Sequence, residues 1–179
     1  MTRLQEMTSP PDTSAGVTER PGSGRSLRSS YGLTISRQTR SGDTPMLEYR
    51  VSARRIDAHE SVADCKDATV VLDTDVMGRR DAFNPAELLL AAVAACMIKG
   101  IERVTPMLKF HMSGVEVRLI GVRQDSPPMM ASIDYELIID TDEDDRRLEL
   151  LHQNVRKYGT ISNTVAAATK LQGVIRRKT

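Results

Sequence analysis

The sequence predicts an α+β fold, and three observations in chain order carry that prediction. Apolar and polar residues alternate with period two at 47–52 and again from Ala68, which is the pattern of half-buried strands. A continuous apolar run at 88–98 is too long for an ordinary strand and favours a helix. Two further alternating segments and then two helical segments close the chain. Strands and helices grouped in this way favour α+β over a parallel α/β sheet.

The chain length suits one compact domain with an arm at its N-terminus. The 179 residues include 40% hydrophobic residues, enough to build a single core. Residues 1–30 are rich in Ser, Thr, Pro, Gly and Arg and contain few aliphatic residues, so they cannot bury enough surface to offset their ordering entropy. We therefore expect a disordered arm at 1–30 and a single domain at 31–179. The first strand of this domain is expected at 33–37 (LTISR).

The charge balance argues for small partners. The 25 Lys and Arg residues and 24 Asp and Glu residues give a net charge of +1 and are spread along the chain, which is not typical of a protein that binds nucleic acid or a membrane surface. No apolar run approaches the roughly 20 residues that span a bilayer, and the N-terminus lacks the apolar core of a secretory signal. We expect a cytoplasmic protein whose partners are neither nucleic acid nor membrane.

The segment FNPAELLLAAVAACMIKGIERV, residues 83–104, predicts the central helix. Asn84 is a good N-cap, Pro85 suits the first helical position, and Glu87 completes a capping box. Residues 88–98 are almost all apolar, so for about three turns this helix has no face suited to water. We expect it to be buried on all sides. A domain of this size covers such a helix most easily if a second subunit packs on it, so we predict an oligomer with this helix near its centre.

The other elements follow from local patterns. A loop is expected at 75–83, where Arg79 and Arg80 could reach an anion at the helix N-terminus, although a solvated loop is the plainer interpretation. A hairpin is expected around 126–128, with one strand face formed by Ile133, Tyr135, Leu137 and Ile139. Its first strand follows His111, which could act as a base for Cys96 if that strand returned past the helix.

Two helices are expected near the C-terminus. The first has acids in its first turn from Asp142, Arg156 and Lys157 in its last turn, and Gly159 as a left-handed cap. Its apolar stripe consists of Leu148, Leu151 and Val155. A short helix is expected from residue 161, and residues 173–177 form a last strand or a tail.

The two cysteines, Cys65 and Cys96, are expected to be free thiols in a reducing compartment. The three histidines are scattered singly, so we predict neither a metal site nor a cofactor. Cys96 lies late in the apolar run, with Lys99 three residues and Arg103 seven residues further on, and a cation on that face would stabilise a thiolate. The alternative is that Cys96 is a small buried hydrophobe.

The segments NPAELLLAAVAAC and KYGTISNT resemble the OsmC/Ohr family of cytosolic peroxide-resistance proteins, and the resemblance covers roughly residues 33–174. It implies an intertwined homodimer in which antiparallel sheets wrap paired central helices, with two active sites at the subunit interface. In the family a first Cys attacks the O–O bond of a hydroperoxide and forms a sulfenic acid. A second Cys then closes a disulfide, which a dithiol reduces.

This sequence departs from the family pattern in ways that bear on the chemistry. Cys96 matches the first Cys, but Gly159 stands at the position of the second, so the usual two-cysteine cycle cannot run. The Glu that peroxidase members place after the Pro is Ala86 here. Glu87 is offset by about 100° around the helix and is interpreted as a cap.

Two further positions stay open. The resemblance implies an active-site Arg from the N-terminal strand or its following loop, for which Arg37, Arg40 and Arg50 are all available. Cys65, in the polar stretch VADCKDA, could replace the second thiol only if its Cα lay within about 7 Å of that of Cys96. An exposed or edge-strand thiol without a partner is the expectation.

Two functional hypotheses from different classes result. In the first, Cys96, assisted by Arg37 or Arg40, reduces an organic hydroperoxide, and an external thiol such as glutathione regenerates it. In the second, the homodimer has lost this chemistry and binds a small hydrophobic molecule in an interface cavity. Cationic neighbours and a solvent path at Cys96 would favour the first hypothesis, and sealed apolar packing would favour the second. A different thiol-dependent reaction on the same scaffold is a third alternative.

Overall fold

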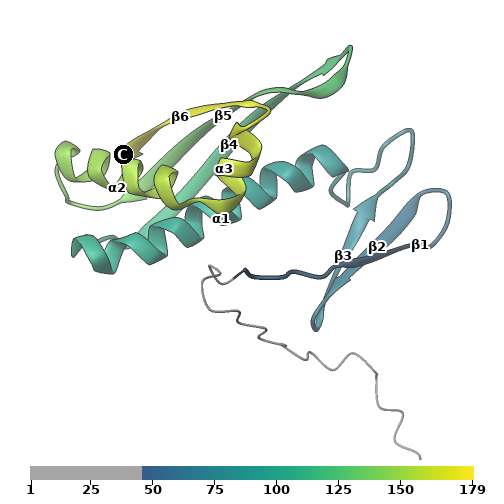
Figure 1. Cartoon of the computed structure of the whole chain (residues 1–179), viewed down its shortest axis with the longest axis horizontal. Coiled ribbons are helices and arrows are strands. Elements are labelled where there is room, and N and C mark those ends of the chain that lie inside the picture. Colours follow the sequence, from purple (N-terminus) through teal and green to yellow (C-terminus); the bar gives the residue numbers. More distant parts are fainter. Residues whose placement is uncertain (1–45) are drawn as a thin grey trace, which may run out of the picture. The chain divides into compact units, whose positions relative to one another are not determined.

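The computed structural model describes residues 46–179 (Figure 1). The arm expected at 1–30, the strand expected at 33–37, and both Arg37 and Arg40 lie outside the described residues.

An antiparallel sheet at the start of the described region has the strand order β1-β2-β3. Its strands are β1 (Ser52–Arg55), β2 (Glu60–Cys65) and β3 (Ala68–Asp73). The prediction of a strand from 68 is confirmed, whereas the strand expected at 47–52 begins only at its last residue. The interpretation of the stretch before Ala68 as a polar connection was wrong, because it includes β2, the central strand. Backbone hydrogen bonds to β1 and β3 hold this strand in place. These bonds do not depend on the side chains, so the apolar–polar pattern of the sequence does not reveal them.

The central helix α1 (Pro85–Leu108) begins where the capping signals predict. The side-chain oxygen of Asn84 accepts hydrogen bonds from the backbone N–H groups of Ala86 at 2.9 Å and Glu87 at 3.0 Å. The Glu87 carboxylate accepts the backbone N–H of Asn84 at 2.9 Å, which closes the capping box. The helix ends at Lys109, which adopts a left-handed conformation with φ 49°. It runs further than the expected segment and includes Pro106.

Only one face of α1 is buried within a single chain. Val93, Met97 and Ile101 are each at most 2% exposed and form the inner stripe. Ala95 and Ile98 belong to the opposite face and are exposed. The expectation that the helix is buried on all sides is therefore not met by one chain, because one chain supplies a sheet and helices for only one of its faces.

The second sheet has the order β4-β5-β6, with β4 (Gly114–Asp125), β5 (Pro128–Asp140) and β6 (Lys170–Arg177). The predicted hairpin is confirmed, and β4 and β5 pair antiparallel across its two-residue turn. The strand β6 pairs parallel to β5, so this sheet is mixed rather than wholly antiparallel as expected. Two helices lie between β5 and β6, and such a crossover is what a parallel pair requires.

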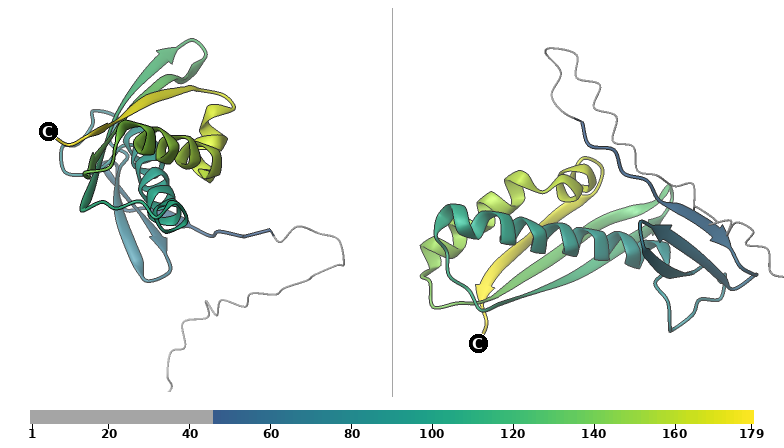
Figure 2. Two further views of the ribbon diagram at one scale, coloured as in Figure 1. Left: turned by 90° about the vertical axis from the view of Figure 1, so that its left-hand side faces the viewer. Right: turned by 90° about the horizontal axis from the view of Figure 1, so that it is seen from below.

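The crossover consists of α2 (Asp145–Tyr158) and α3 (Thr160–Ala166). The Asp144 carboxylate caps α2 by accepting the backbone N–H of Arg147 at 2.8 Å. The predicted stripes on α2 and β5 are confirmed, since none of their seven residues is more than 4% exposed. Apart from Ile133, these side chains and the inner stripe of α1 form one core, with α1 and α2 against the same face of the sheet (Figure 2).

Gly159 joins α2 to α3 with φ −78° and ψ 103°. The prediction of a left-handed cap at this position was wrong, because that backbone conformation is open to any residue. The need for glycine comes from packing instead. A Cβ at this position would lie 3.1 Å from both the Cβ and the Oγ of Ser162 and 3.3 Å from the carbonyl oxygen of Val155.

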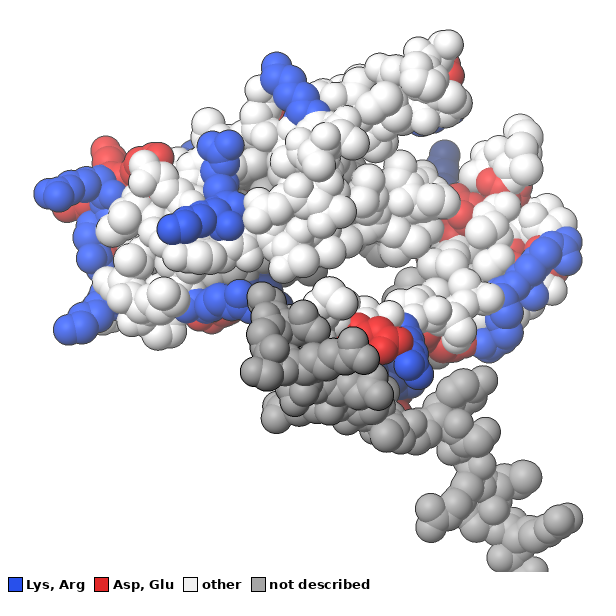
Figure 3. Space-filling model, in the orientation of Figure 1, with Lys and Arg blue, Asp and Glu red and all other residues white. Residues whose placement is uncertain are grey.

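The surface shows no gathering of like charge on the face in view. Lys and Arg side chains are separated by neutral surface and by acids (Figure 3). Among the residues that the structure describes, no helix has the length and apolarity needed to cross a bilayer.

Candidate functional site around Cys96

Cys96 lies on α1 at the border between its buried stripe and its exposed face. The residue before it, Ala95, is exposed, the residue after it, Met97, is 2% exposed, and Cys96 itself is half-buried. Its sulfur is a free thiol. The thiol is therefore not sealed in the core of one chain.

Two cations follow Cys96 on the same helix. Lys99 and Arg103 are exposed, and neither forms an ion pair with any residue in 46–179. A cation without an acid partner is available to stabilise a nearby thiolate. The structure records no hydrogen bond between either side chain and the sulfur.

Cys65 is the last residue of β2, where it stands opposite Ala68 on β3. It is half-buried and free, like Cys96, so these two cysteines form no disulfide with each other. The expectation that Cys65 is a thiol without a partner stays a prediction. The suggestion that it lies on an edge strand was wrong, because β2 is the central strand of its sheet.

Glu87, the acid at the start of α1, caps the helix and does not act on the Cys96 thiol. The Glu87 carboxylate is engaged by the backbone of Asn84, which confirms that Glu87 is a cap. Ala86, where peroxidase members of the resembling family have a carboxylate, contributes only its backbone N–H to the cap.

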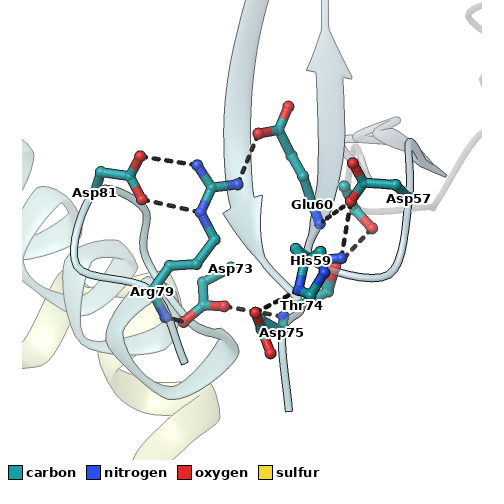
Figure 4. A network of polar contacts seen from close by, with 9 residues as sticks. Asp57, His59, Glu60, Asp73, Thr74, Asp75, Arg79 and Asp81 are labelled. Atoms are coloured by element: carbon teal, nitrogen blue, oxygen red, sulfur yellow. Dashed lines mark hydrogen bonds and ion pairs between the residues drawn. The ribbon is translucent and has the colours of Figure 1, made fainter. Parts of the chain in front are cut away.

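Arg79 lies in the loop before α1, where it forms hydrogen bonds with three acidic residues (Figure 4). Its guanidinium donates to Glu60 at 2.6 Å and to both carboxylate oxygens of Asp81 at 2.8 and 2.9 Å. Its backbone N–H donates to Asp73 at 2.8 Å. The hydrogen bonds that Arg79 donates to Asp81 and then to Glu60 raise its pKa. Arg79 therefore orders the loop and is not available to an anion at the start of α1, and the loop is more structured than the solvated one that the sequence suggested.

Two other candidates lie away from the thiol or at the surface. Arg50 is 79% exposed and pairs with Glu48 at 2.8 Å. His111 is 91% exposed and follows the C-terminus of α1, where its ring lies 3.5 Å from Glu143. Cys96 is 12 residues before the last residue of α1, or about 18 Å along the axis, so His111 is not placed to act as its base.

A cleft that the sequence analysis missed lies beside the core. It has a volume of about 370 Å³ and is bordered by α1, β5, α2, α3 and β6. The buried hydroxyl of Tyr135 is hydrogen bonded to His152 Nε2 at 2.9 Å next to this cleft. Burial raises the pKa of Tyr135 and lowers the pKa of His152. The residues of the cleft come from five elements, which is why no local pattern signals it: Met97, Tyr135, Glu149, Gln153, Arg156, Lys157, Ser162, Asn163, Ala166 and Leu171.

The fold and the cysteine on its central helix define a small α+β thiol protein. A family model described as OsmC-like protein matches residues 78–172, more than half of the chain. The chain belongs to the OsmC-like family. This confirms the family and the α+β class that the sequence predicts.

Solved structures agree in fold. The OsmC-like protein from Mycoplasma pneumoniae has a TM-score of 0.68 and 17% identity, covering 74% of this chain and 99% of that one. The organic hydroperoxide resistance protein of Bacillus subtilis has a TM-score of 0.55 and 17% identity, covering 73% and 98%. An OsmC-like protein of unknown function from Vibrio cholerae has a TM-score of 0.63 and 10% identity, covering 73% and 100%. No curated protein matches the chain, and these identities show the fold alone.

Proposed function

We propose that this chain is a one-cysteine thiol enzyme that reduces organic hydroperoxides. The observation that carries the proposal is the position of Cys96, a free and half-buried thiol at the edge of the exposed face of α1. Two of the structural relatives with this fold are described as organic hydroperoxide resistance proteins, from Bacillus subtilis and Legionella pneumophila.

The proposed cycle needs one protein sulfur. The Cys96 thiolate attacks one oxygen of the hydroperoxide, the O–O bond breaks, and the departing alkoxide takes a proton to become an alcohol. The sulfur is oxidised to a sulfenic acid. One external thiol then forms a mixed disulfide and releases water, and a second external thiol restores the Cys96 thiol and leaves as the external disulfide.

The external reductant replaces a resolving cysteine within the chain. Gly159 holds no sulfur, and its packing against Ser162 leaves little space for a larger side chain. Cys65 ends a strand in the other sheet and is free. Glutathione is the proposed class of reductant, and it would require the reducing cytoplasm that the sequence also suggests.

A cation is the remaining requirement, because the thiolate is the reactive form. Arg37 and Arg40 are the proposed candidates, and both lie outside the described residues. Lys99 and Arg103, one turn and two turns after Cys96, supply additional positive charge from α1.

We further propose that the enzyme is a homodimer with α1 at its centre. The face of α1 that includes Ala95 and Ile98 is apolar and exposed in the single chain. Apolar surface of this kind is typical of an interface. Cys96 borders this face, so a second subunit would complete the walls of its site.

The direct test is consumption of cumene hydroperoxide at one equivalent per subunit. The wild-type protein and Cys65→Ser should both consume it faster than free cysteine, and Cys96→Ser should not. The thiol pKa of Arg37→Ala and of Arg40→Ala is measured from the pH dependence of thiol alkylation. The Arg that stabilises the Cys96 thiolate should be the one whose replacement raises this pKa. Wild-type protein that reacts no faster than free cysteine would exclude the peroxidase proposal.

The second candidate function is binding of a small hydrophobic molecule in a cavity at the dimer interface. Ala86 and Gly159, which lack the carboxylate and the sulfur of peroxidase members, favour it, as does the apolar exposed face of α1. A slow wild-type thiol together with saturable binding of a hydrophobic dye, lost when the dimer is broken, would support this function.

A further inference from the structure

We propose that the cleft beside α2 and α3 binds a small organic anion, with a carboxylate at its polar end and a short apolar body. This site is distinct from the Cys96 site, because Cys96 is not among its lining residues. Its volume of about 370 Å³ lies at the small end of the roughly 300–1,000 Å³ typical of organic-ligand pockets.

The apolar part of the cleft is provided by the core. Met97 of α1 and Tyr135 of β5 are 2% and 4% exposed, and Leu171 of β6 is half-buried. Ala166 of α3 adds a small side chain on the same lining. A flexible hydrocarbon chain fits such walls, and the thioether of Met97 adapts to its shape.

Ser162 marks the polar end of the site. The residue is 5% exposed, and its hydroxyl is the one buried side-chain polar atom in 46–179 that has no hydrogen-bond partner. A buried hydroxyl without a partner is destabilising, and native proteins rarely retain one without a reason. Because Ser162 lines the cleft, an acceptor atom on a ligand would complete its hydrogen bonding.

The charges around the cleft favour an anion. Arg156 and Lys157 line it, and Glu149 is the one acid among its lining residues. Glu149 accepts a hydrogen bond from Gln153 at 3.0 Å, and the two cations against this one acid leave the lining with a net positive charge. Arg156 forms no ion pair with any residue of the described region, so its charge is available to a ligand.

The remaining polar groups are occupied among themselves. The Tyr135 hydroxyl pairs with His152, whose other ring nitrogen lies 3.8 Å from Glu149. The Asn163 amide donates to the backbone carbonyl of Lys157 at 3.3 Å. These contacts leave the Ser162 hydroxyl, the Arg156 guanidinium and the Lys157 ammonium as the groups that a carboxylate would contact.

The test is a two-dimensional NMR titration of the full chain with octanoate and, separately, with octanol. Octanoate should shift amide signals of α3 saturably, and octanol should bind at least about fivefold more weakly, since it lacks the charge that Arg156 recognises. Arg156→Gln should raise the Kd for octanoate by about fivefold. Ser162→Ala should raise it by about tenfold, as for loss of a hydrogen bond to a charged group.

Arg146→Gln is the matched control. Arg146 is exposed on α2, has no ion-pair partner in the described region, and does not line the cleft, so its variant should bind octanoate like wild type. Cys96→Ser should also bind like wild type, which separates this proposal from the peroxidase proposal. Absence of saturable octanoate binding, equal affinities for octanoate and octanol, or equal losses in Arg156→Gln and Arg146→Gln would each overturn it.

Discussion

Ser162 allows a prediction in which removing a polar group stabilises the ligand-free protein. Its buried hydroxyl has no partner, so Ser162→Ala should raise the free energy of unfolding by about 1 kcal/mol, the lower end of the cost of an unsatisfied buried group. Urea unfolding measures the change. Thr164→Ala is the control on the same helix, because the Thr164 hydroxyl donates to the carbonyl of Thr160 at 2.9 Å and its loss should not stabilise. Destabilisation by Ser162→Ala would show that the hydroxyl is satisfied in solution.

Gly159 gives a second prediction, and it concerns space. An added methyl group would approach Ser162 and the Val155 carbonyl more closely than normal contacts allow, so Gly159→Ala should lower the free energy of unfolding by about 1–3 kcal/mol. Gly114→Ala is the control, since its Cβ would meet the nearest atom at an ordinary 3.7 Å. Equal stabilities of the two variants, again from urea unfolding, would contradict the packing explanation.

Single residues were predictable where their partners are close in sequence. Asn84 and Glu87 are three residues apart, and their mutual hydrogen bonds follow from that spacing. Ser162 and Tyr135 meet the same cleft from different elements, and nothing in the local sequence joins them. The position of Cys96 on its helix was predictable, but the exposure of its neighbours was not, because exposure depends on what packs against α1.

At the scale of elements, the end of α1 is joined to the start of α2 by Arg147. Its guanidinium donates to the backbone carbonyls of Leu108 at 3.1 Å and Lys109 at 2.8 Å, and to Glu143 at 2.8 Å. Glu143 also accepts the backbone N–H of His111 at 3.0 Å. The hydrogen bond from Arg147, and then that from His111, lowers the pKa of Glu143 to about 2.

This lowered pKa predicts the sign of a pH effect. The folded pKa of about 2 lies below the ordinary 4.5, so the stabilisation from ionised Glu143 is fully present above pH 4.5 and is lost as the pH falls through 2. Glu143→Gln should therefore lower Tm near pH 7, with a difference from wild type that shrinks between pH 4.5 and 2. Thermal unfolding measured over this range tests it.

Asp125→Asn is the control for the Glu143 experiment. Asp125 is 88% exposed and pairs only with Arg123 two residues before it, so its variant should stay close to wild type throughout. A Glu143→Gln difference that stays constant down to pH 2 would contradict the ionisation argument.

The elements that the sequence predicts well are those defined by their own pattern. The cap of α1, the β4–β5 hairpin and the stripe of α2 depend on residues within each element. The strand β2 and the parallel pairing of β6 depend on neighbours elsewhere in the chain. Hydrogen bonding between strands does not require a particular residue type, so the sequence leaves strand order and direction open.

At the scale of the molecule, one chain leaves large apolar side chains exposed on several elements. Ile98 on α1 is 37% exposed, and on the outer face of the second sheet Ile120 of β4 and Val174 of β6 are 70% and 59% exposed. Contiguous apolar surface on a folded protein marks an interaction site. The sequence predicts that α1 is buried on all sides, and one chain buries only one of its faces. A second copy of the chain packed on the open face would bury the rest.

The homodimer proposal predicts that a charge on the open face of α1 separates the subunits. Wild-type protein should elute at twice the 19.8 kDa chain mass, and Ala95→Lys should elute as a monomer, because a buried unpaired ammonium is strongly unfavourable. Light scattering coupled to size-exclusion chromatography measures both masses. Asp142→Lys is the control at an exposed, already charged position outside α1, and it should remain dimeric. A monomeric wild type, or a dimeric Ala95→Lys, would remove α1 from the interface, and the Cys96 site would then be formed by one chain alone.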